Sequence, residues 1–196
     1  MKQKKCKVCQ VEYTPQRIGQ KVCGYKCAIE LAKEQSWKER KEVLKESTKT
    51  LGDYAKELQK EVNKLVRLID FGKTCISSGI FPKKPQAGHY RSVGAYPALR
   101  YHLDNIHLQS YEQNVEKSGN PLGYRQGLKE RYGIEYLNYV DNLPNEYPSL
   151  KPTKEELVEA TKKAREIIRG FEKKSRTPKE MIELRNDINL QLGFYL

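Results

Sequence analysis

The sequence has no long apolar segment and little apolar material in general. No run of hydrophobic residues approaches the roughly 20 that a helix needs to cross a bilayer, so no transmembrane helix is expected. Only 37% of the 196 residues are hydrophobic, whereas 32% are charged. We therefore expect a small core and helices that are largely exposed to solvent. No signal peptide is recognisable either, and we expect a cytoplasmic protein whose thiols stay reduced.

Acidic residues are too few to balance the basic ones. The chain has 37 Lys and Arg against 25 Asp and Glu, a formal net charge of +12. Such an excess attracts phosphate polyanions through counterion release. A soluble basic protein without a nucleic-acid partner is the simpler alternative, and an anionic membrane surface is disfavoured because no basic helix has a wide aromatic and leucine face. We therefore expect nucleic acid as the partner.

Cysteine is also scarce, but four of the five cysteines share one short segment. Their spacing is Cys6-x2-Cys9-x13-Cys23-x3-Cys27. Two close thiolate pairs a dozen or so residues apart are typical of a tetrahedral structural zinc site. Four thiolate ligands leave no open position, so we expect a structural zinc knuckle over residues 1–30, the alternative being four unconnected cysteines.

The chain has only three histidines, and all of them fall in one window. His89 lies in a strand-like segment, residues 87–93, while His102 and His107 lie in a second, residues 99–108. Alternation predicts that His107 faces the site or water, and His102 is expected on a solvent-facing strand position. Ser110 can then cap a short helix. A strand with His, a strand with Asn and a helix with a polar ligand is the order of a ββα-metal (HNH-type) site.

Several segments of the chain, taken together, resemble the NinG (Rap) family of phage recombination endonucleases, which cut branched DNA. The matching segments are Cys75-Ile-Ser-Ser-Gly79, Ala87-Gly-His-Tyr-Arg-Ser-Val-Gly-Ala95, Leu99-Arg-Tyr, Asp104-Asn-Ile-His-Leu-Gln109, Lys117-Ser-Gly-Asn120 and Tyr124-Arg. The cysteine pattern near the amino terminus fits the same family. The resemblance covers most of the chain and is weakest in its last quarter.

The resemblance implies a role for each polar residue of the window. His89 would be the general base, and its near-neutral pKa suits that task. Asn105 would orient the His89 ring, and His107 is a further catalytic candidate. Candidate DNA contacts are the cations Arg91, Arg100, Lys117 and Arg125.

The expected ligands of a catalytic Mg²⁺ or Mn²⁺ ion depart from the family pattern. An acidic residue stands three positions before the histidine in the family, and Gln86 occupies that place here. The other ligand position, on the helix, holds Asn114. Neutral amide oxygens suit a hard cation less well than carboxylates, so both residues are weak candidates. Asp104, or His107 with a softer ion, could substitute.

A second zinc knuckle of the family is expected to be empty in this chain. Its ligand positions hold Cys75, Ser78, Ser110 and Gln113, and one thiolate cannot hold a structural zinc. The stability of this module must then come from apolar packing by Ile76, Val93, Leu99, Leu103, Ile106 and Leu108.

These features predict a mostly helical α+β protein: a zinc knuckle with four cysteine ligands (residues 1–30), a helical connector (31–72), an HNH-like ββα module with flanking helices (73–143), and a linker with a carboxy-terminal helical hairpin (144–196). The connector carries an apolar stripe behind Asp53, which is a candidate N-cap of its second helix. Beside it lie Lys56, Lys60, Lys64 and Arg67, as a solvated face or a rail for DNA. Pro121 is expected to begin a helix that ends before Gly133, with a second short helix after it. Capping boxes at Thr153 and Thr177 open the last two helices. The basic residues near the hairpin turn, Arg176 among them, are expected either to contact DNA or only to keep the protein soluble.

By resemblance we expect a phage recombination protein in the host cytoplasm that binds Holliday junctions or D-loops and cleaves them. A catalytically impaired DNA-binding protein of the same fold is the first alternative. A zinc-bearing adaptor that docks other recombination proteins is the second. A homodimer is expected by analogy, since resolving a symmetric junction needs two active centres.

Overall fold

A computed structural model describes residues 2–195 and divides the chain into two compact units, with the boundary between Thr50 and Leu51. The protein is mostly helical with two small sheets, which confirms the expected α+β class. The connector expected over residues 31–72 therefore divides between the units. Within the described part of the chain, no helix is long and apolar enough to cross a membrane.

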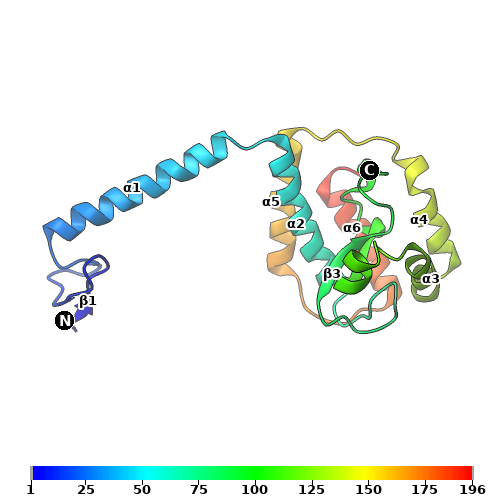
Figure 1. Ribbon diagram of the computed structural model, residues 1–196, viewed down its shortest axis with the longest axis horizontal. Helices are drawn as coiled ribbons and strands as arrows, with labels where there is room; N and C mark the ends of the chain where they lie inside the picture. Colours follow the sequence, from blue (N-terminus) through cyan, green and yellow to red (C-terminus); the bar gives the residue numbers. More distant parts are fainter. Residues whose placement is uncertain (1, 196) are drawn as a thin grey trace. The chain divides into compact units, whose positions relative to one another are not determined.

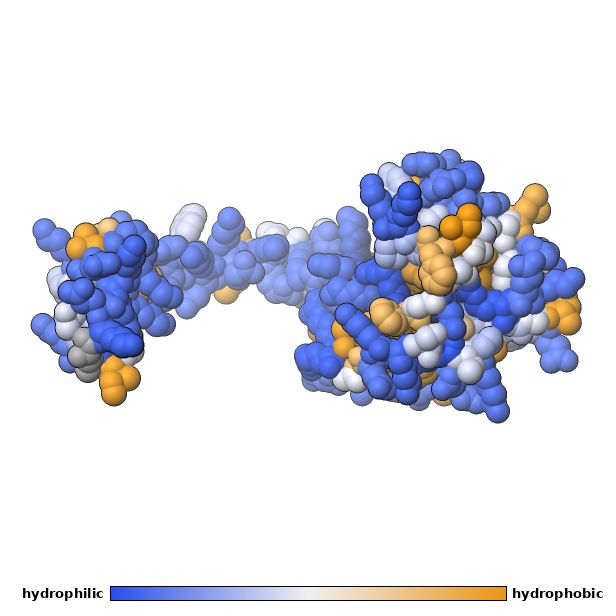
Figure 2. Space-filling view, turned by 90° about the horizontal axis from the view of Figure 1, so that it is seen from below, coloured by the Kyte–Doolittle hydropathy of each residue, from blue (hydrophilic) through white to orange (hydrophobic). Residues whose placement is uncertain are grey.

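The first unit holds a two-stranded hairpin and one long helix. Strand β1 (Lys4–Lys5) pairs antiparallel with β2 (Glu12–Tyr13), and α1 spans Tyr25–Ser47. Helix α1 buries none of its residues; even Trp37 is 68% exposed. Hydrophilic side chains dominate its visible surface (Figure 2). Residues 38–50 are almost wholly polar, and α1 continues through them as far as Ser47.

The second unit is built on α2 (Leu51–Ile69), whose apolar stripe is wholly buried. The stripe consists of Tyr54, Leu58, Val62, Leu65, Val66 and Ile69, as the spacing predicts. Helices α5 (Lys154–Gly170) and α6 (Pro178–Leu192) pack with α2 (Figure 1). Both begin with the predicted capping boxes, at Thr153 and Thr177. Helix α2 begins at Leu51, two residues before the expected cap at Asp53.

A β-hairpin crosses this helical layer. Strand β3 (Pro85–His89) pairs antiparallel with β4 (Ile106–Ser110), with Ala87 opposite Leu108. The strands are shorter than predicted, because residues 97–105 form two 3₁₀ turns, η1 (Pro97–Leu99) and η2 (Leu103–Asn105). A π-helical turn, η3 (Glu112–Glu116), follows β4. The order strand, strand, short helix is therefore present.

Helices α3 (Pro121–Tyr132) and α4 (Ile134–Glu146) cover a second apolar cluster and separate at Gly133, as predicted. Helix α4 continues through Pro144, so the expected linker begins three residues later than the composition indicates. Of the predicted apolar supports of the module, five are buried: Ile76, Leu99, Leu103, Ile106 and Leu108. Val93 is only half-buried.

Candidate functional site

His89 is the last residue of β3, and its ring is half-buried. Its Nε2 lies 2.9 Å from the carbonyl oxygen of Arg100. A carbonyl can only accept a hydrogen bond, so Nε2 carries the proton and Nδ1 keeps the lone pair. Burial lowers the pKa of His89; the hydrogen bond to the Arg100 carbonyl raises it in part, the positive charge of Arg100 lowers it slightly further, and the net shift is downward. The imidazole is therefore neutral at neutral pH, with one nitrogen anchored and the other free to accept a proton.

Asn105 holds the loop that presents the Arg100 carbonyl. Its Oδ1 accepts from the backbone amide of Arg91 at 2.8 Å, and its Nδ2 donates to the carbonyls of Arg91 at 3.0 Å and Leu99 at 3.2 Å. The side chain is fully buried and makes no hydrogen bond to the His89 ring. Asn105 thus acts on His89 through the backbone at residues 99 and 100, which is less direct than the expected contact.

Three of the four predicted DNA-binding cations already have carboxylate partners. Arg91 and Arg125 both donate to Asp141, at 2.8 Å in the case of Arg91. Lys117 lies 2.7 Å from Glu112. Arg100 differs, because its Nε donates to the neutral amide oxygen of Gln59 at 3.3 Å. Among these four, Arg100 has the least compensated charge, and DNA contact by the other three stays a prediction.

The expected orientations of His107 and His102 are wrong. Neither ring is accessible: His107 is 0% exposed and His102 is 1% exposed. His107 Nδ1 lies 3.1 Å from the hydroxyl of Tyr124. Alternation along β4 gave a wrong prediction because both faces of this strand are covered by other elements. Residues on either face are therefore buried. A side chain with no exposed surface cannot contact substrate, and His107 is a core residue.

Strand alternation separates the candidate metal ligands from His89. Gln86 and Gly88 share one face of β3, whereas Ala87 and His89 share the other. Asn114 belongs to the first face, because a Cβ on Gly88 would lie 3.0 Å from its Oδ1. The amide oxygens of Gln86 and Asn114 are neutral and lie across the strand from the His89 ring. They do not fit a catalytic Mg²⁺ or Mn²⁺ site at His89.

The residues at the second knuckle come together without a ligand set for zinc. The Sγ atom of Cys75 accepts from the backbone amide of Ser110 at 3.3 Å. Ser110 Oγ in turn accepts from the amide of Gln113 at 3.3 Å, although Tyr111, and not Ser110 as expected, occupies the N-cap position of η3. Burial raises the pKa of Cys75, but hydrogen bonds from Ser78 and from nearby backbone amides more than offset it, so the net shift is downward. Hydrogen bonds therefore brace the turn where the family would place an ion.

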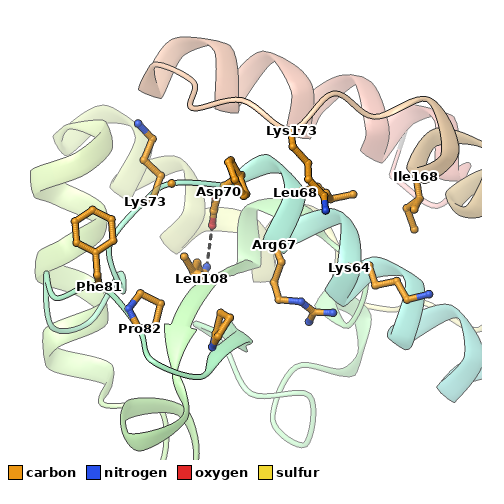
Figure 3. A pocket seen from close by; sticks show the side chains of 13 residues that line it. Lys64, Arg67, Leu68, Asp70, Lys73, Phe81, Pro82, Leu108, Ile168 and Lys173 are labelled. Atoms are coloured by element: carbon orange, nitrogen blue, oxygen red, sulfur yellow. Dashed lines mark hydrogen bonds between the residues drawn. The ribbon is translucent and has the colours of Figure 1, made fainter.

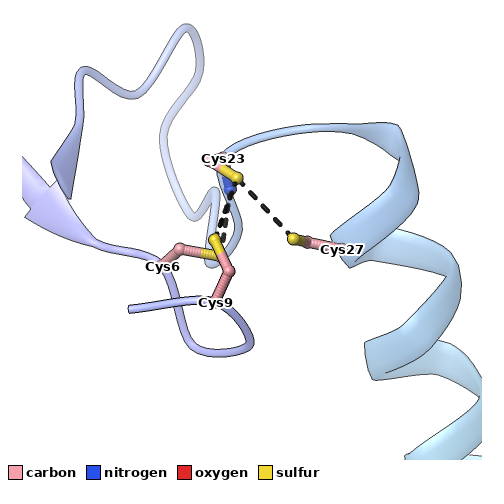
Figure 4. Close-up of side chains that lie close together, drawn as sticks. All are labelled: Cys6, Cys9, Cys23 and Cys27. Atoms are coloured by element: carbon pink, nitrogen blue, oxygen red, sulfur yellow. Dashed lines mark hydrogen bonds between the residues drawn. The ribbon is translucent and has the colours of Figure 1, made fainter. Parts of the chain in front are cut away.

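The four cysteines of the first unit form one cluster (Figure 4). Their sulfur atoms all lie within 4.8 Å of one another, with Cys9 and Cys23 at 3.5 Å and Cys23 and Cys27 at 3.7 Å. Tetrahedral zinc with Zn–S bonds of about 2.3 Å sets its sulfurs roughly 3.8 Å apart. Within residues 2–195, this is the one group of three or more His, Cys, Asp or Glu side chains close enough to hold an ion. The cluster can bind a metal such as zinc.

A basic hollow of about 300 Å³ lies on the exposed side of α2. Its cationic lining consists of Lys56, Lys60, Arg67 and Arg100, with Gln59 and Asn63 between them. Arg100 belongs to the loop whose carbonyl holds His89. Through Arg100, the loop that holds His89 therefore contributes to the hollow on the basic side of α2, a side predicted as a solvated face or a DNA rail.

The largest feature missed by the sequence analysis is a buried polar network. Arg185 on α6 donates to Asp70 at 2.6 Å, and Asn189 donates to Asp104 at 3.0 Å. All four side chains are buried. Asp104 also accepts from Tyr136 at 2.7 Å. Because its carboxylate is buried and hydrogen-bonded to core residues, Asp104 is not available as a ligand for a metal ion. A single sequence gives no signal for such pairs, because their members are 115 and 85 residues apart.

Comparison with known proteins decides the family. The model of the family described as bacteriophage lambda NinG protein matches residues 31–174. The chain belongs to the NinG family. It is 31% identical to protein ninG of Enterobacteria phage H19B over 166 residues, which is 74% of this chain and 83% of that protein. Protein ninG of phage lambda is 29% identical over 161 residues, covering 71% and 79% of the two chains.

The region matched by the NinG model contains the whole hairpin and α2, with His89, Asn105 and the basic hollow. It begins after Cys27 and ends before Arg185. No solved structure matches the chain.

Arg176 also departs from its expected place in the basic cluster near the α5–α6 turn. It is buried, and its guanidinium donates to the backbone carbonyls of Leu68 at 3.3 Å and Glu172 at 2.7 Å. This arginine ties the α5–α6 connection to the end of α2 and offers no charge to a partner.

Proposed function

We propose that this NinG-family protein binds branched DNA, such as four-way junctions and D-loops, and cleaves it as a structure-specific endonuclease that requires a divalent metal. The observation that carries the proposal is the state of His89. Its imidazole is neutral, one nitrogen is anchored to the Arg100 carbonyl, and the other is free. This geometry is that of a general base, and Arg100, whose carbonyl anchors the ring, also lines the basic hollow.

The binding part of the proposal rests on charge. The chain carries a net charge of +12, and Lys60, Arg67 and Arg100 line one hollow in which no carboxylate takes part. Each phosphate that a cation neutralises releases counterions, so affinity should fall steeply with salt, with a slope of about 0.9 per contact on a log–log scale. Contacts to the phosphate backbone would supply this affinity, and contacts at the branch point would supply the preference for branched DNA over linear duplex.

The proposal of cleavage rests on His89 and on Arg100, whose carbonyl anchors the ring. Hydrolysis of a phosphodiester needs an activated water and stabilisation of the charge that develops on phosphate and leaving oxygens. His89 Nδ1 would take the proton of the attacking water, while Nε2 stays bonded to the Arg100 carbonyl. Arg100 would hold the phosphate. A divalent ion, when bound, supplies further charge stabilisation, but we assign no ligands to it because Gln86 and Asn114 do not fit.

A catalytically impaired DNA-binding protein is the second candidate. The observation that favours it is the same pair of neutral residues, Gln86 and Asn114, set across β3 from His89. In that case the fold and the basic hollow would serve binding alone. We further propose that the four-cysteine cluster holds a structural zinc, and that two copies of the chain act on one junction because a symmetric junction has two strands to cut.

One assay separates these candidates. Purified protein is incubated with an end-labelled four-way junction and with linear duplex, in Mg²⁺ or Mn²⁺, and binding and cleavage are scored separately. Cleavage of the junction that is lost in His89→Ala supports the enzyme. Salt-sensitive binding of the junction without cleavage supports the impaired form, and failure to bind any DNA at about 100 mM salt supports a protein adaptor. Light scattering of the complex reports whether two chains bind each junction.

A further inference from the structure

A pocket lies at the carboxy-terminal end of α2, apart from the His89 loop (Figure 3). Its volume is about 530 Å³, within the range of roughly 300–1,000 Å³ that is typical of small-molecule sites. The last turns of α2, the turn at residues 71–73, the segment 81–85 and the ends of α5 and the α5–α6 connection enclose it. All of these segments belong to the second unit.

The walls of the pocket are apolar and partly aromatic. Leu68, Leu108 and Ile168 line it together with Pro82 and Pro85. Two phenylalanine rings complete the lining without being packed into the core: Phe71 is 45% exposed and Phe81 is 68% exposed. Exposed aromatic rings beside a basic surface are the platforms on which proteins stack unpaired bases.

The one carboxylate in the pocket is already compensated. Asp70 accepts from Arg185 at 2.6 Å through Oδ1 and from the backbone amide of Leu108 at 2.8 Å through Oδ2. Figure 3 shows this carboxylate directed at Leu108 in the floor, between Phe81 and Arg67. It therefore does not repel an anion that enters the pocket.

The rim of the pocket carries uncompensated positive charge. Lys64 is paired with Glu61 at 2.7 Å. Arg67, Lys73 and Lys173 also line the pocket, and within residues 2–195 none of these three has a carboxylate partner. Arg67 is half-buried, and this burial lowers its pKa. A partly desolvated guanidinium without a counter-ion is stabilised when an anionic ligand binds.

Arg67 also joins the pocket to the basic hollow beside His89. It lines both, and Lys60 lies two helical turns earlier on α2, about 10 Å away. Arg100 lines the same hollow and belongs to the loop that holds His89. One nucleic-acid strand can therefore contact the hollow and the pocket along a single face of α2.

We propose that the pocket receives an unpaired nucleotide of the bound DNA, with its base against Phe81 and Phe71 and its phosphate on Arg67. The inference rests on the proposed function, since it presumes that the basic hollow binds DNA. An apolar side chain of a protein partner would match the walls of the pocket but would leave its cationic rim uncompensated. A nucleotide matches both parts of the lining, because its base can contact the apolar walls and its phosphate can pair with the cationic rim.

The test uses three four-way junctions and fluorescence anisotropy. The first is fully paired, the second has one unpaired thymidine at the branch point, and the third has an abasic residue in that place. We expect the full chain to bind the thymidine junction about tenfold more tightly than the abasic one, as base stacking predicts. Phe81→Ala should remove this difference, and Arg67→Gln should weaken binding to all three junctions.

Two matched variants serve as controls. Leu122→Ala removes a side chain that is 84% exposed on α3, and Lys179→Gln removes a charge that is 87% exposed on α6. Both should keep the preference for the thymidine junction. Equal affinity of wild type for the thymidine and abasic junctions would overturn the inference and leave the proposed function intact. Loss of binding to every junction by the wild-type chain would overturn both.

Discussion

The guanidinium of Arg185 donates to the carboxylate of Asp70 at 2.6 Å, and neither side chain has any exposed surface. Asp70 directly follows α2 and accepts from the amide of Leu108 on β4, while Arg185 also donates to the carbonyl of Ile106. One ion pair on the last helix therefore fixes β4 against α2. Because Asn105 immediately precedes β4, the helix α6 supports the loop that holds His89.

Arg185→Leu should destabilise the second unit strongly, because it leaves Asp70 buried and without its counter-ion. Breaking one side of a buried ion pair costs about 3–5 kcal/mol, and urea unfolding followed by circular dichroism measures the loss. Lys179→Leu on the same helix breaks an exposed contact to Glu183 at 4.0 Å and should cost less than about 1 kcal/mol. Equal effects of the two substitutions would contradict this account of the ion pair.

Gly127→Ala should also destabilise the fold. A Cβ at residue 127 would lie 1.7 Å from the carbonyl oxygen of Ile76, so α3 could not keep its close approach to that segment. Overpacking of this kind costs roughly 1–3 kcal/mol. Gly170→Ala, at the end of α5, meets no atom within 4 Å and should change the free energy of unfolding by less than about 0.5 kcal/mol. Thermal unfolding of both variants tests the difference.

His102 should make the protein sensitive to acid. Burial, helped by the positive charge of Arg185, lowers its pKa to about 3, and its Nδ1 has no hydrogen-bond partner among residues 2–195. Because the unfolded histidine has a pKa of about 6.5, the unfolded state binds the proton first as the pH falls. Stability is therefore full above pH 6.5 and is lost progressively down to about pH 3, by roughly 3 kcal/mol between pH 7 and pH 4.

His102→Phe tests this pH dependence, because it keeps ring contacts with Tyr147 and Tyr195 but cannot be protonated. Urea midpoints at pH 7 and pH 4 should fall less in the variant than in the wild type. Asp104 lies 3.6 Å from His102 Nδ1, and burial raises its pKa, but it is present in both proteins and cancels in the comparison. An identical loss of stability in both would rule out His102 as the cause.

The four-cysteine cluster predicts one zinc per chain. Cys23→Ser should reduce the zinc content of the purified protein to near zero. Cys75→Ser should leave it near one ion per chain, because Cys75 accepts a hydrogen bond from Ser110 and does not belong to the cluster. Plasma mass spectrometry gives the count. A chelator should unfold the knuckle while the second unit, which has its own core, keeps its thermal transition. A count of two zinc ions would contradict the account of Ser78, Ser110 and Gln113.

Local signals in the sequence predicted most helices and the hairpin. The stripe from Tyr54 to Ile69, the capping boxes at Thr153 and Thr177, and Pro121 with Gly133 each act within a few residues of the chain, so periodicity and end signals suffice. Residues 99–105 were predicted as strand because their 3₁₀ turns depend on the side chain of Asn105, which forms hydrogen bonds with Arg91 and Leu99.

The candidate site was predicted less completely than the fold. The motif around His89 identified the residue with a free ring nitrogen, but its face on β3 relative to Gln86 and Asn114 depends on register. His102 and His107 were predicted to face water or the site, but both are buried. Helices α3, α4 and α6 cover that side of β4 and of the turn before it. These contacts join residues far apart in the chain, and no local pattern encodes them.

If His89 is the base of a phosphodiester hydrolysis, its loss must slow the chemical step itself, which is measured as the single-turnover cleavage rate of a four-way junction by His89→Ala with and without added imidazole. We expect the substitution to lower the rate by about 100-fold or more, with junction affinity unchanged and with imidazole restoring part of the rate in proportion to its neutral fraction. Cleavage by His89→Ala at the wild-type rate would contradict the claim.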